Sequence, residues 1–92
     1  MLVYAVCYDI ADDHKRNQVA KRLLQYGHRV QFSVYEITLH SKEELDTLCQ
    51  QLRHIAEEEA RFRLYRLCEN CRRASQDLTG KIIVEMPVVV IL

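Results

Sequence analysis

The stretch LVYAVCYD, residues 2–9, is apolar at nearly every position and rich in aromatic and β-branched side chains. Such a run predicts a central β-strand that is covered on both faces. The pair Asp12-Asp13 then predicts an N-cap and an acidic first turn for a helix that runs to about Tyr26, with Gly27 as its C′ residue. The last residue of the strand, Asp9, therefore leads into a helix N-terminus, whose free N–H groups attract anions.

Farther along the chain, the hydrophobic period changes in a regular order. Residues 29–39 alternate with a period of two, which predicts a second strand. Ser41, with Glu44 three residues later, forms a capping-box pattern that opens a second helix. Residues 61–67 alternate again, a polar stretch follows, and we expect a last strand from about Lys81.

These elements predict an α+β fold, the ferredoxin-like βαββαβ sandwich, in which two helices cover one face of a four-stranded antiparallel sheet and an extra C-terminal strand follows. Residues 1–92 are too few for a second core and form a single domain. The first two strands carry apolar residues on both faces, which two helices cannot cover. We therefore expect a twofold homodimer rather than a monomer that folds over itself, and the Pro87-interrupted strand at about 81–92 could pair with the partner protomer.

The net charge conceals an uneven distribution of charges. Thirteen basic and thirteen acidic side chains give a formal charge of zero, which excludes a strongly basic nucleic-acid tail. Segment 14–29 nevertheless holds five basic residues and no acid, and segment 61–73 holds five arginines against Glu69 alone. Six of the thirteen acids lie in residues 42–59, against two basic residues. Each cluster alone is typical of a solvated face, but two arginine-rich segments beside a dimer interface favour contacts with phosphates.

Composition also bears on where the protein works. The N-terminus has no basic leader before its apolar run, and the longest apolar stretch, residues 82–92, is far shorter than the roughly 20 residues of a membrane span. Cys7 and Cys49 lie at apolar positions where thiols act as small hydrophobes. We expect a cytoplasmic protein with reduced cysteines and no membrane partner.

Asp9 is the residue most suited to catalysis. A carboxylate at a strand end could hold Mg²⁺, which takes few protein ligands and keeps waters and phosphate oxygens. The metal would activate a water and offset charge on a phosphodiester. One carboxylate per chain is a small number of protein ligands for a metal ion, but a twofold axis close to the strand would bring two carboxylates together. The alternative is that Asp9 closes an Asx-turn or caps the helix.

Aromatic and basic residues near Asp9 are further candidates. Tyr8 and Tyr35 could position a phosphate or stack on a base, or they could be core aromatics with a solvated hydroxyl. Arg16 and Arg29 could grip phosphates, or they could be ordinary surface charges.

The pair Cys68 and Cys71 forms a lone CxxC motif. Structural zinc needs four ligands, which one chain does not supply here. A metal site completed by the partner and simple packing both stay open.

A series of short motifs runs through the first 39 residues: Tyr8-Asp9-Ile10, Asp12-Asp13, Arg16-Asn17, Val19-Ala20, Tyr26-Gly27, Arg29-Val30-Gln31 and Ser33-Val34-Tyr35-Glu36. Together they resemble the small second core family of CRISPR-associated proteins, the CRISPR-associated endoribonucleases. The resemblance extends through the second helix to most of the chain. Gln18, where some members carry a second helix arginine, departs from the pattern.

The resemblance implies a homodimer that joins the CRISPR-associated integrase in spacer acquisition. It further implies a Mg²⁺-dependent endonuclease that acts on single-stranded RNA or double-stranded DNA. Asp9 would then be the catalytic metal ligand, one from each protomer, and Tyr8 a catalytic residue before it. Arg16, Arg29 and Tyr35 match functional positions of the family. The full set of expected nucleic-acid-binding residues adds three arginines from the basic segments: Arg16, Arg22, Arg29, Tyr35, Arg72 and Arg73.

Two other functions fit the same residues. The first is a non-catalytic adaptor that bridges integrase dimers and holds duplex DNA by its backbone through arginines. The second is a toxin-like ribonuclease of the same fold.

Overall fold

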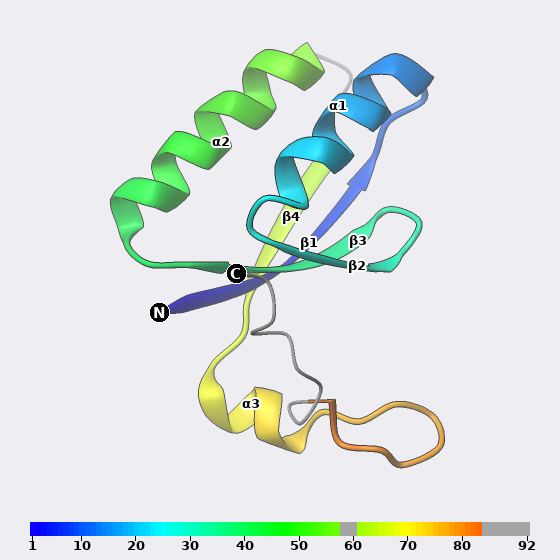
Figure 1. Cartoon of the computed structure of the whole chain (residues 1–92), viewed down its shortest axis with the longest axis vertical. Helices are drawn as coiled ribbons and strands as arrows, with labels where there is room; N and C mark the ends of the chain where they lie inside the picture. The colour runs from blue at the N-terminus through cyan, green and yellow to red at the C-terminus, as the bar shows by residue number, and fades with distance from the viewer. Residues whose placement is uncertain (58–60, 84–92) are drawn as a thin grey trace.

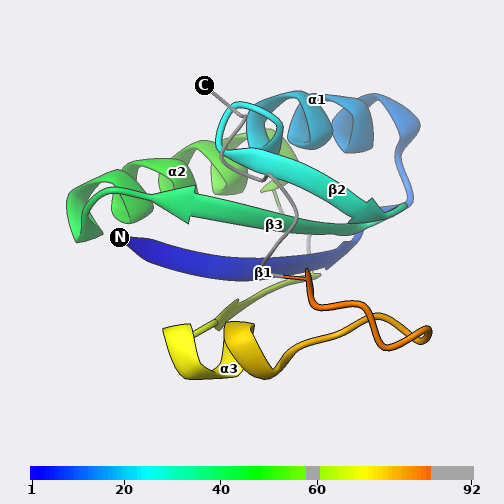
Figure 2. The same ribbon diagram turned by 60° about the horizontal axis from the view of Figure 1, so that its bottom comes forward.

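The computed structural model describes residues 1–57 and 61–83, and its central feature is a sheet with strand order β2-β3-β1-β4. All three pairs of neighbouring strands are antiparallel. Helices α1 and α2 cover one face of this sheet (Figures 1 and 2), so the α+β, ferredoxin-like βαββαβ fold is confirmed. In chain order the elements are β1 (Leu2–Asp9), α1 (Asp13–Leu23), β2 (Gly27–Gln31), β3 (Val34–Leu39), α2 (Lys42–Ala56), β4 (Arg61–Arg66) and α3 (Glu69–Ala74).

The core lies between the sheet and the two helices. Alternate residues of each strand face the helices, as the period of two requires. Val6 and Tyr8 of β1 are buried there, together with Leu48, Leu52 and Ala56 of α2. The buried hydrophobic residues are Val6, Tyr8, Ile10, Val19, Leu23, Tyr35, Ile37, Leu39, Leu48, Leu52 and Ala56.

The caps of α1 and α2 agree with the sequence patterns. The Asp12 side chain accepts a hydrogen bond of 2.9 Å from the Lys15 N–H, and this bond holds the pKa of the Asp12 carboxyl below its usual value. At α2, the Ser41 hydroxyl accepts from the Glu44 N–H at 3.2 Å. The Glu44 carboxylate accepts in return from the backbone N–H of His40 at 2.9 Å. Both helices therefore start where their caps place them.

The prediction of one strand over residues 29–39 was wrong, because this stretch is a hairpin. Strands β2 and β3 are joined by a turn at Phe32 and Ser33, and an irregularity between Arg29 and Gln31 shifts their register. Alternation of apolar residues continues through the turn, so the period of two did not reveal it. The split supplies the fourth strand of the sheet.

Gly27 has a different role from the one its position after a helix suggests. Helix α1 ends at Leu23, and Gly27 is the first residue of β2 rather than the C′ residue. A Cβ atom at Gly27 would lie 1.8 Å from the backbone oxygen of Glu36 in β3. Glycine is needed here because two backbones approach closely.

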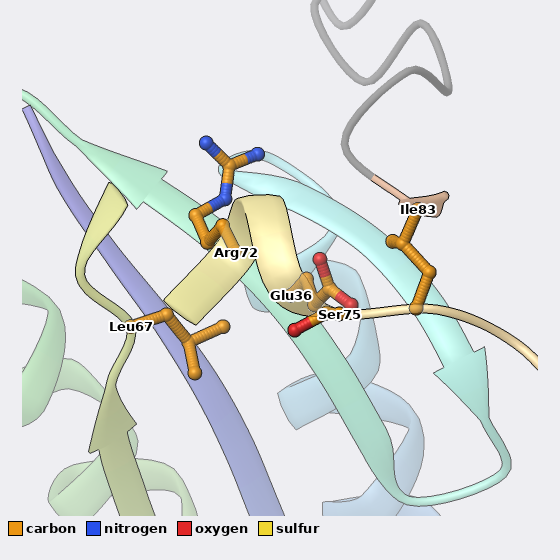
Figure 3. A pocket seen from close by; sticks show the side chains of 5 residues that line it. All are labelled: Glu36, Leu67, Arg72, Ser75 and Ile83. Atoms are coloured by element: carbon orange, nitrogen blue, oxygen red, sulfur yellow. The ribbon is translucent and has the colours of Figure 1, made fainter. Parts of the chain in front are cut away.

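The second face of the sheet is partly covered by the chain itself. The polar stretch after β4 contains α3, which lies with the segment up to residue 83 on the side opposite α1 and α2 (Figure 2). Between them and the sheet is a cavity of about 20 Å³, room for about one water molecule. Figure 3 shows the lining side chains, Glu36, Leu67, Arg72, Ser75 and Ile83.

The expected C-terminal strand falls largely outside the described residues, which end at residue 83. Within them, Ile82 forms an isolated antiparallel bridge with Gln76. Among residues 1–57 and 61–83, none of the helices has both the length and the apolar character needed to cross a membrane.

Substituting alanine for Gly27 is expected to lower the free energy of unfolding by about 2–3 kcal/mol, because the new Cβ meets a backbone carbonyl and not a movable side chain. Urea unfolding measures the change. Gln25→Ala, at an exposed residue in the preceding turn, is the control and should stay within about 0.5 kcal/mol of the parent. Equal midpoints for the two variants would contradict the close approach as the reason for glycine.

Candidate functional site

Three segments meet at one end of the sheet: the end of β1, the turn between β2 and β3, and the start of α1 (Figure 2). The Tyr8 N–H donates to the Ser33 carbonyl at 3.2 Å, which ties the turn to the end of β1. Asp9 is the next residue, and Arg16 follows in the first turns of α1. Five residues that the sequence nominates lie in or beside these segments: Tyr8, Asp9, Arg16, Arg29 and Tyr35.

The Asp9 carboxylate is exposed at the last position of β1. Because side chains alternate along a strand, Asp9 lies on the sheet face opposite the buried Tyr8 and hence opposite α1 and α2. Its side chain makes no hydrogen bond or ion pair with residues 1–57 or 61–83, whereas its backbone is paired with Arg61 in the sheet. The cap of α1 is Asp12, so the alternative in which Asp9 caps the helix is not what the structure shows.

Tyr8 lies in an aromatic cluster under the helices, with only 7% of its surface exposed. Its ring stacks on Tyr35 at a centroid distance of 6.1 Å and contacts Phe62 at 5.3 Å. Burial, and secondarily the neighbouring Tyr35 phenol, raises the pKa of the Tyr8 hydroxyl strongly, while the charges of Arg29 and Arg16 act in the opposite direction. Tyr8 is therefore a neutral phenol near neutral pH.

Arg16 is bound to the loop that leads from β1 to α1. Its guanidinium donates to the carbonyl oxygens of Ile10 at 2.8 Å and Ala11 at 3.1 Å. It also pairs with the Asp13 carboxylate. Arg16 is thus half-buried, and its charge orders the backbone that follows Asp9.

Arg29 and Phe32 form the outer part of the site. The Arg29 side chain is exposed, and its guanidinium carbon lies 6.0 Å from the centroid of the Tyr35 ring and 5.7 Å from that of Phe32. The Arg16 guanidinium carbon lies 5.4 Å from the Phe32 centroid. Sequence reasoning missed Phe32. Phe32 could have been noticed as a functional candidate because it is a large aromatic residue in a tight turn, where small and polar residues usually occur.

Three of the arginines nominated from charge lie elsewhere. Arg22 is in the last turn of α1, more than one helical turn beyond Arg16, and it donates to Gln25 at 3.4 Å. Arg72 and Arg73 are on α3, across the sheet from α1. Arg73 pairs with Glu69 at 2.7 Å, and Figure 3 shows the Arg72 guanidinium turned away from Glu36.

The CxxC motif begins α3. The Cys71 N–H donates to the Cys68 sulfur at 3.2 Å, and hydrogen bonding with Cys71 lowers the pKa of the Cys68 thiol and raises that of Cys71. Both thiols are exposed. In the described part of the chain, no three His, Cys, Asp or Glu residues are grouped so that they could hold a metal ion. Within residues 1–57 and 61–83, Asp9 is the metal ligand that the sequence nominates at the end of β1.

Comparison with known proteins places the chain in a family. The family model described as CRISPR associated protein Cas2 matches residues 1–74. The chain is 41% identical over 86 residues to the CRISPR-associated endoribonuclease Cas2 4 of Rhodospirillum rubrum, covering 92% of this chain and 67% of the relative. It is 46% identical over 68 residues to the CRISPR-associated endoribonuclease Cas2 3 of a Synechocystis strain, covering 73% of each.

Solved structures agree with the sequence matches. A chain of a partial Cas6-RT-Cas1–Cas2 complex superposes with a TM-score of 0.84 at 29% identity, over the whole of both chains. Cas2 of Streptococcus pyogenes superposes with a TM-score of 0.71 at 30% identity, over 83% of this chain and 98% of that one. The suspected resemblance is thereby confirmed, and the chain belongs to the Cas2 family of CRISPR-associated proteins.

Proposed function

We propose that this protein is a metal-dependent endonuclease that cleaves phosphodiester bonds of nucleic acid and acts in CRISPR spacer acquisition. The observation that carries the proposal is the exposed Asp9 carboxylate, which has no partner among the described residues and lies at the sheet end where Arg16 and Arg29 are found. A carboxylate at the sheet end that also carries arginines and aromatic rings suits a substrate that brings both phosphates and bases. Two relatives named as endoribonucleases support the same chemistry.

Asp9 is the residue that would hold Mg²⁺. Magnesium commonly uses only one or two protein carboxylates and fills its other positions with water and substrate phosphate, so a single exposed Asp9 per chain fits it. When bound, the ion would lower the pKa of a water and offset charge on the phosphodiester. The chain's own contribution is to hold the carboxylate rigidly at the end of β1, with Arg61 as its cross-strand neighbour in β4.

The remaining residues of the site have different roles. Arg29 is exposed and would contact substrate phosphates, whereas Arg16 holds the loop after Asp9 through carbonyl hydrogen bonds. Tyr8, a buried neutral phenol, would act as a positioning residue that fixes the strand end against Tyr35. Its raised pKa argues against a phenolate acting as a base near neutral pH.

A homodimer would complete the site. Asp9 lies on the sheet face opposite α1 and α2, so a twofold axis across that face would bring the two carboxylates toward each other. Half-buried apolar side chains on the same face of β1, Val3, Ala5 and Cys7, supply surface for such a contact. Any contribution of residues 84–92 to pairing lies outside the described residues.

A second candidate function is an adaptor that bridges integrase subunits without cleaving. The full-length match to a chain from a complex containing Cas1 favours it. In this role the arginines alone would bind duplex DNA, and Asp9 would be dispensable. Membership of the Cas2 family favours both of these functions over a toxin-like ribonuclease.

Replacing Asp9 by asparagine is expected to reduce Mg²⁺-dependent cleavage by about 100-fold or more, because the isosteric amide keeps the size of the carboxylate but loses its charge. Cleavage of a labelled single-stranded RNA and of a labelled duplex DNA measures the effect. Asp46→Asn, at an exposed acid on α2, is the matched control and should cleave like the parent. If the two variants cleave equally fast, Asp9 is not the metal ligand. Spacer integration that survives Asp9→Asn would support the adaptor function.

Removing the Arg29 charge is expected to weaken nucleic-acid binding and to flatten its salt dependence. Each lost phosphate contact should reduce the slope of log K against log salt concentration by about 0.7–0.9. Fluorescence anisotropy between low and moderate salt measures this slope for Arg29→Ala. Arg53→Ala, at an exposed arginine of α2, is the control with the same change in net charge. Identical slopes for the two variants would exclude Arg29 from phosphate contact.

The buried state of Tyr8 predicts an alkaline loss of stability. Its pKa in the folded protein is raised above the ordinary tyrosine value of 10.0, so above that pH the unfolded chain loses the proton first. The free energy of unfolding should therefore fall as pH rises past about 10, by at most about 1.4 kcal/mol per pH unit from this group. Tyr8→Phe should remove this slope, whereas Tyr65→Phe, at an exposed tyrosine, should keep it. Parallel urea unfolding curves across this pH range for the parent and Tyr8→Phe would contradict the burial of a neutral phenol.

A further inference from the structure

Phe32 is a conspicuous apolar residue at the catalytic end of the sheet. It lies in the tight turn between β2 and β3 with 66% of its surface exposed. A single exposed apolar residue carries little meaning on its own. What distinguishes Phe32 is its surroundings, because two guanidinium groups, those of Arg16 and Arg29, lie within 6 Å of its ring centroid.

The two cations lie beside the ring and give its surroundings a positive charge. Arg16 is itself fixed by hydrogen bonds to the Ile10 and Ala11 carbonyls, so its charge stays beside the ring. Arg29, on the other hand, is exposed and can contact solvent and Phe32 together. An exposed aromatic ring held between arginines combines a flat apolar surface with positive charge, the two features that single-stranded nucleic-acid sites use.

The ring is also close to the proposed reaction centre. The turn that carries Phe32 is tied to the end of β1 by the hydrogen bond from the Tyr8 N–H to the Ser33 carbonyl. Asp9 follows Tyr8 directly, so the turn and the end of β1 that carries Asp9 lie at the same end of the sheet (Figure 2). A strand held at Phe32 would therefore lie at the end of the sheet that carries Asp9.

We propose that Phe32 is a stacking platform for an unpaired base of a single-stranded substrate, with Arg29 contacting a phosphate of the same strand. The inference rests on the proposed nuclease function and adds a residue that contacts its substrate. Bases inside a duplex have both faces covered by their neighbours, so the ring can stack on an unpaired base but not on an internal base pair. Every base has a flat face, so the platform would tolerate any sequence.

The ligand chemistry follows from the site. A single strand offers an unpaired base for the Phe32 ring and a phosphate for the Arg29 guanidinium. The internal base pairs of duplex DNA would contact the arginines but not the ring. A second copy of this chain packed on Phe32 would contact the ring but would not need the Arg29 charge. The experiment below separates these two occupants from a single strand.

The test measures binding of a single-stranded RNA by Phe32 variants in a metal chelator, so that no cleavage occurs. Each RNA carries one 2-aminopurine, whose fluorescence is quenched when the base stacks. Phe32→Ala is expected to weaken binding by about 5- to 50-fold and to abolish the quenching. Phe32→Tyr, which keeps the flat ring, should restore both, and the salt slope should be the same in all three proteins because Arg29 is retained.

A matched set of RNAs with one abasic nucleotide isolates the stacking contact. For the parent protein, removal of the stacked base should weaken RNA binding about as much as Phe32→Ala does. For the Phe32→Ala variant, removal of the same base should not weaken binding any further. Phe32→Leu, which keeps apolar bulk without an aromatic face, should behave like Phe32→Ala.

Three results would overturn the platform. One is a Phe32→Leu variant that binds and quenches like the parent. Another is an equal loss of affinity for a covalently closed circular duplex DNA, which has no exposed base-pair face. The third is a change in oligomeric mass of Phe32→Ala that accounts for its lost binding, which would assign the ring to self-association. Failure of the proposed nuclease function has a different signature, since it would appear as Asp9→Asn cleaving like the parent while the Phe32 variants still differ in binding.

Discussion

Strand β1 is hydrogen-bonded along both of its edges, to β3 on one side and β4 on the other, and the rest of the structure depends on this double pairing. The ladder with β3 covers residues 2–7 and the ladder with β4 covers residues 4–9, so the whole strand is held in register and its alternation is strict. Tyr8 must then enter the core, and Asp9 must lie on the opposite face. The position of the carboxylate is therefore fixed by the packing of the core, without any contact made by the carboxylate itself.

At the same end of the sheet, one arginine stabilises the fold and another is available for binding. Arg16 and Arg29 look equivalent in sequence, since both are arginines in a basic segment. In the structure Arg16 donates to two loop carbonyls, and hydrogen bonds from charged groups of this kind are worth about 1.5–3 kcal/mol each. Freeing that guanidinium for a phosphate would cost this energy. Arg29 has no comparable restraint among the described residues, which makes it the better phosphate ligand of the two.

Local patterns in the sequence predicted most of the fold, because the interactions behind them are local. The apolar run of β1, the Asp12 cap and the Ser41–Glu44 capping box all act within a few residues, and all appear in the structure. The hairpin turn at Phe32–Ser33 was missed because the alternation passes through it unchanged.

The features that sequence could not supply are contacts between distant segments. Gly27 is required by the backbone of Glu36 in another strand, which no local pattern encodes. The candidate site divides in the same way. Tyr8 and Asp9 follow from the strand end, whereas Arg72 and Arg73 were chosen for charge alone and lie across the sheet on α3. Whether a charge belongs to a site depends on the fold that carries it.

The distribution of acids over the fold constrains how a nucleic acid could approach. Helix α2 carries Glu43, Glu44 and Asp46 in its first turns, and its end is linked to α1 by the Lys15–Glu57 pair at 3.8 Å. The basic charge of α1 is thus partly neutralised on the side that faces α2, and phosphates would be repelled from the outer surface of α2. The turn that carries Phe32 and the adjacent Arg29 lie away from these acids. A polyanion is therefore directed away from α2, toward the strand end that carries the exposed ring and the unrestrained arginine, with the Asp9 carboxylate on the other face of the same end.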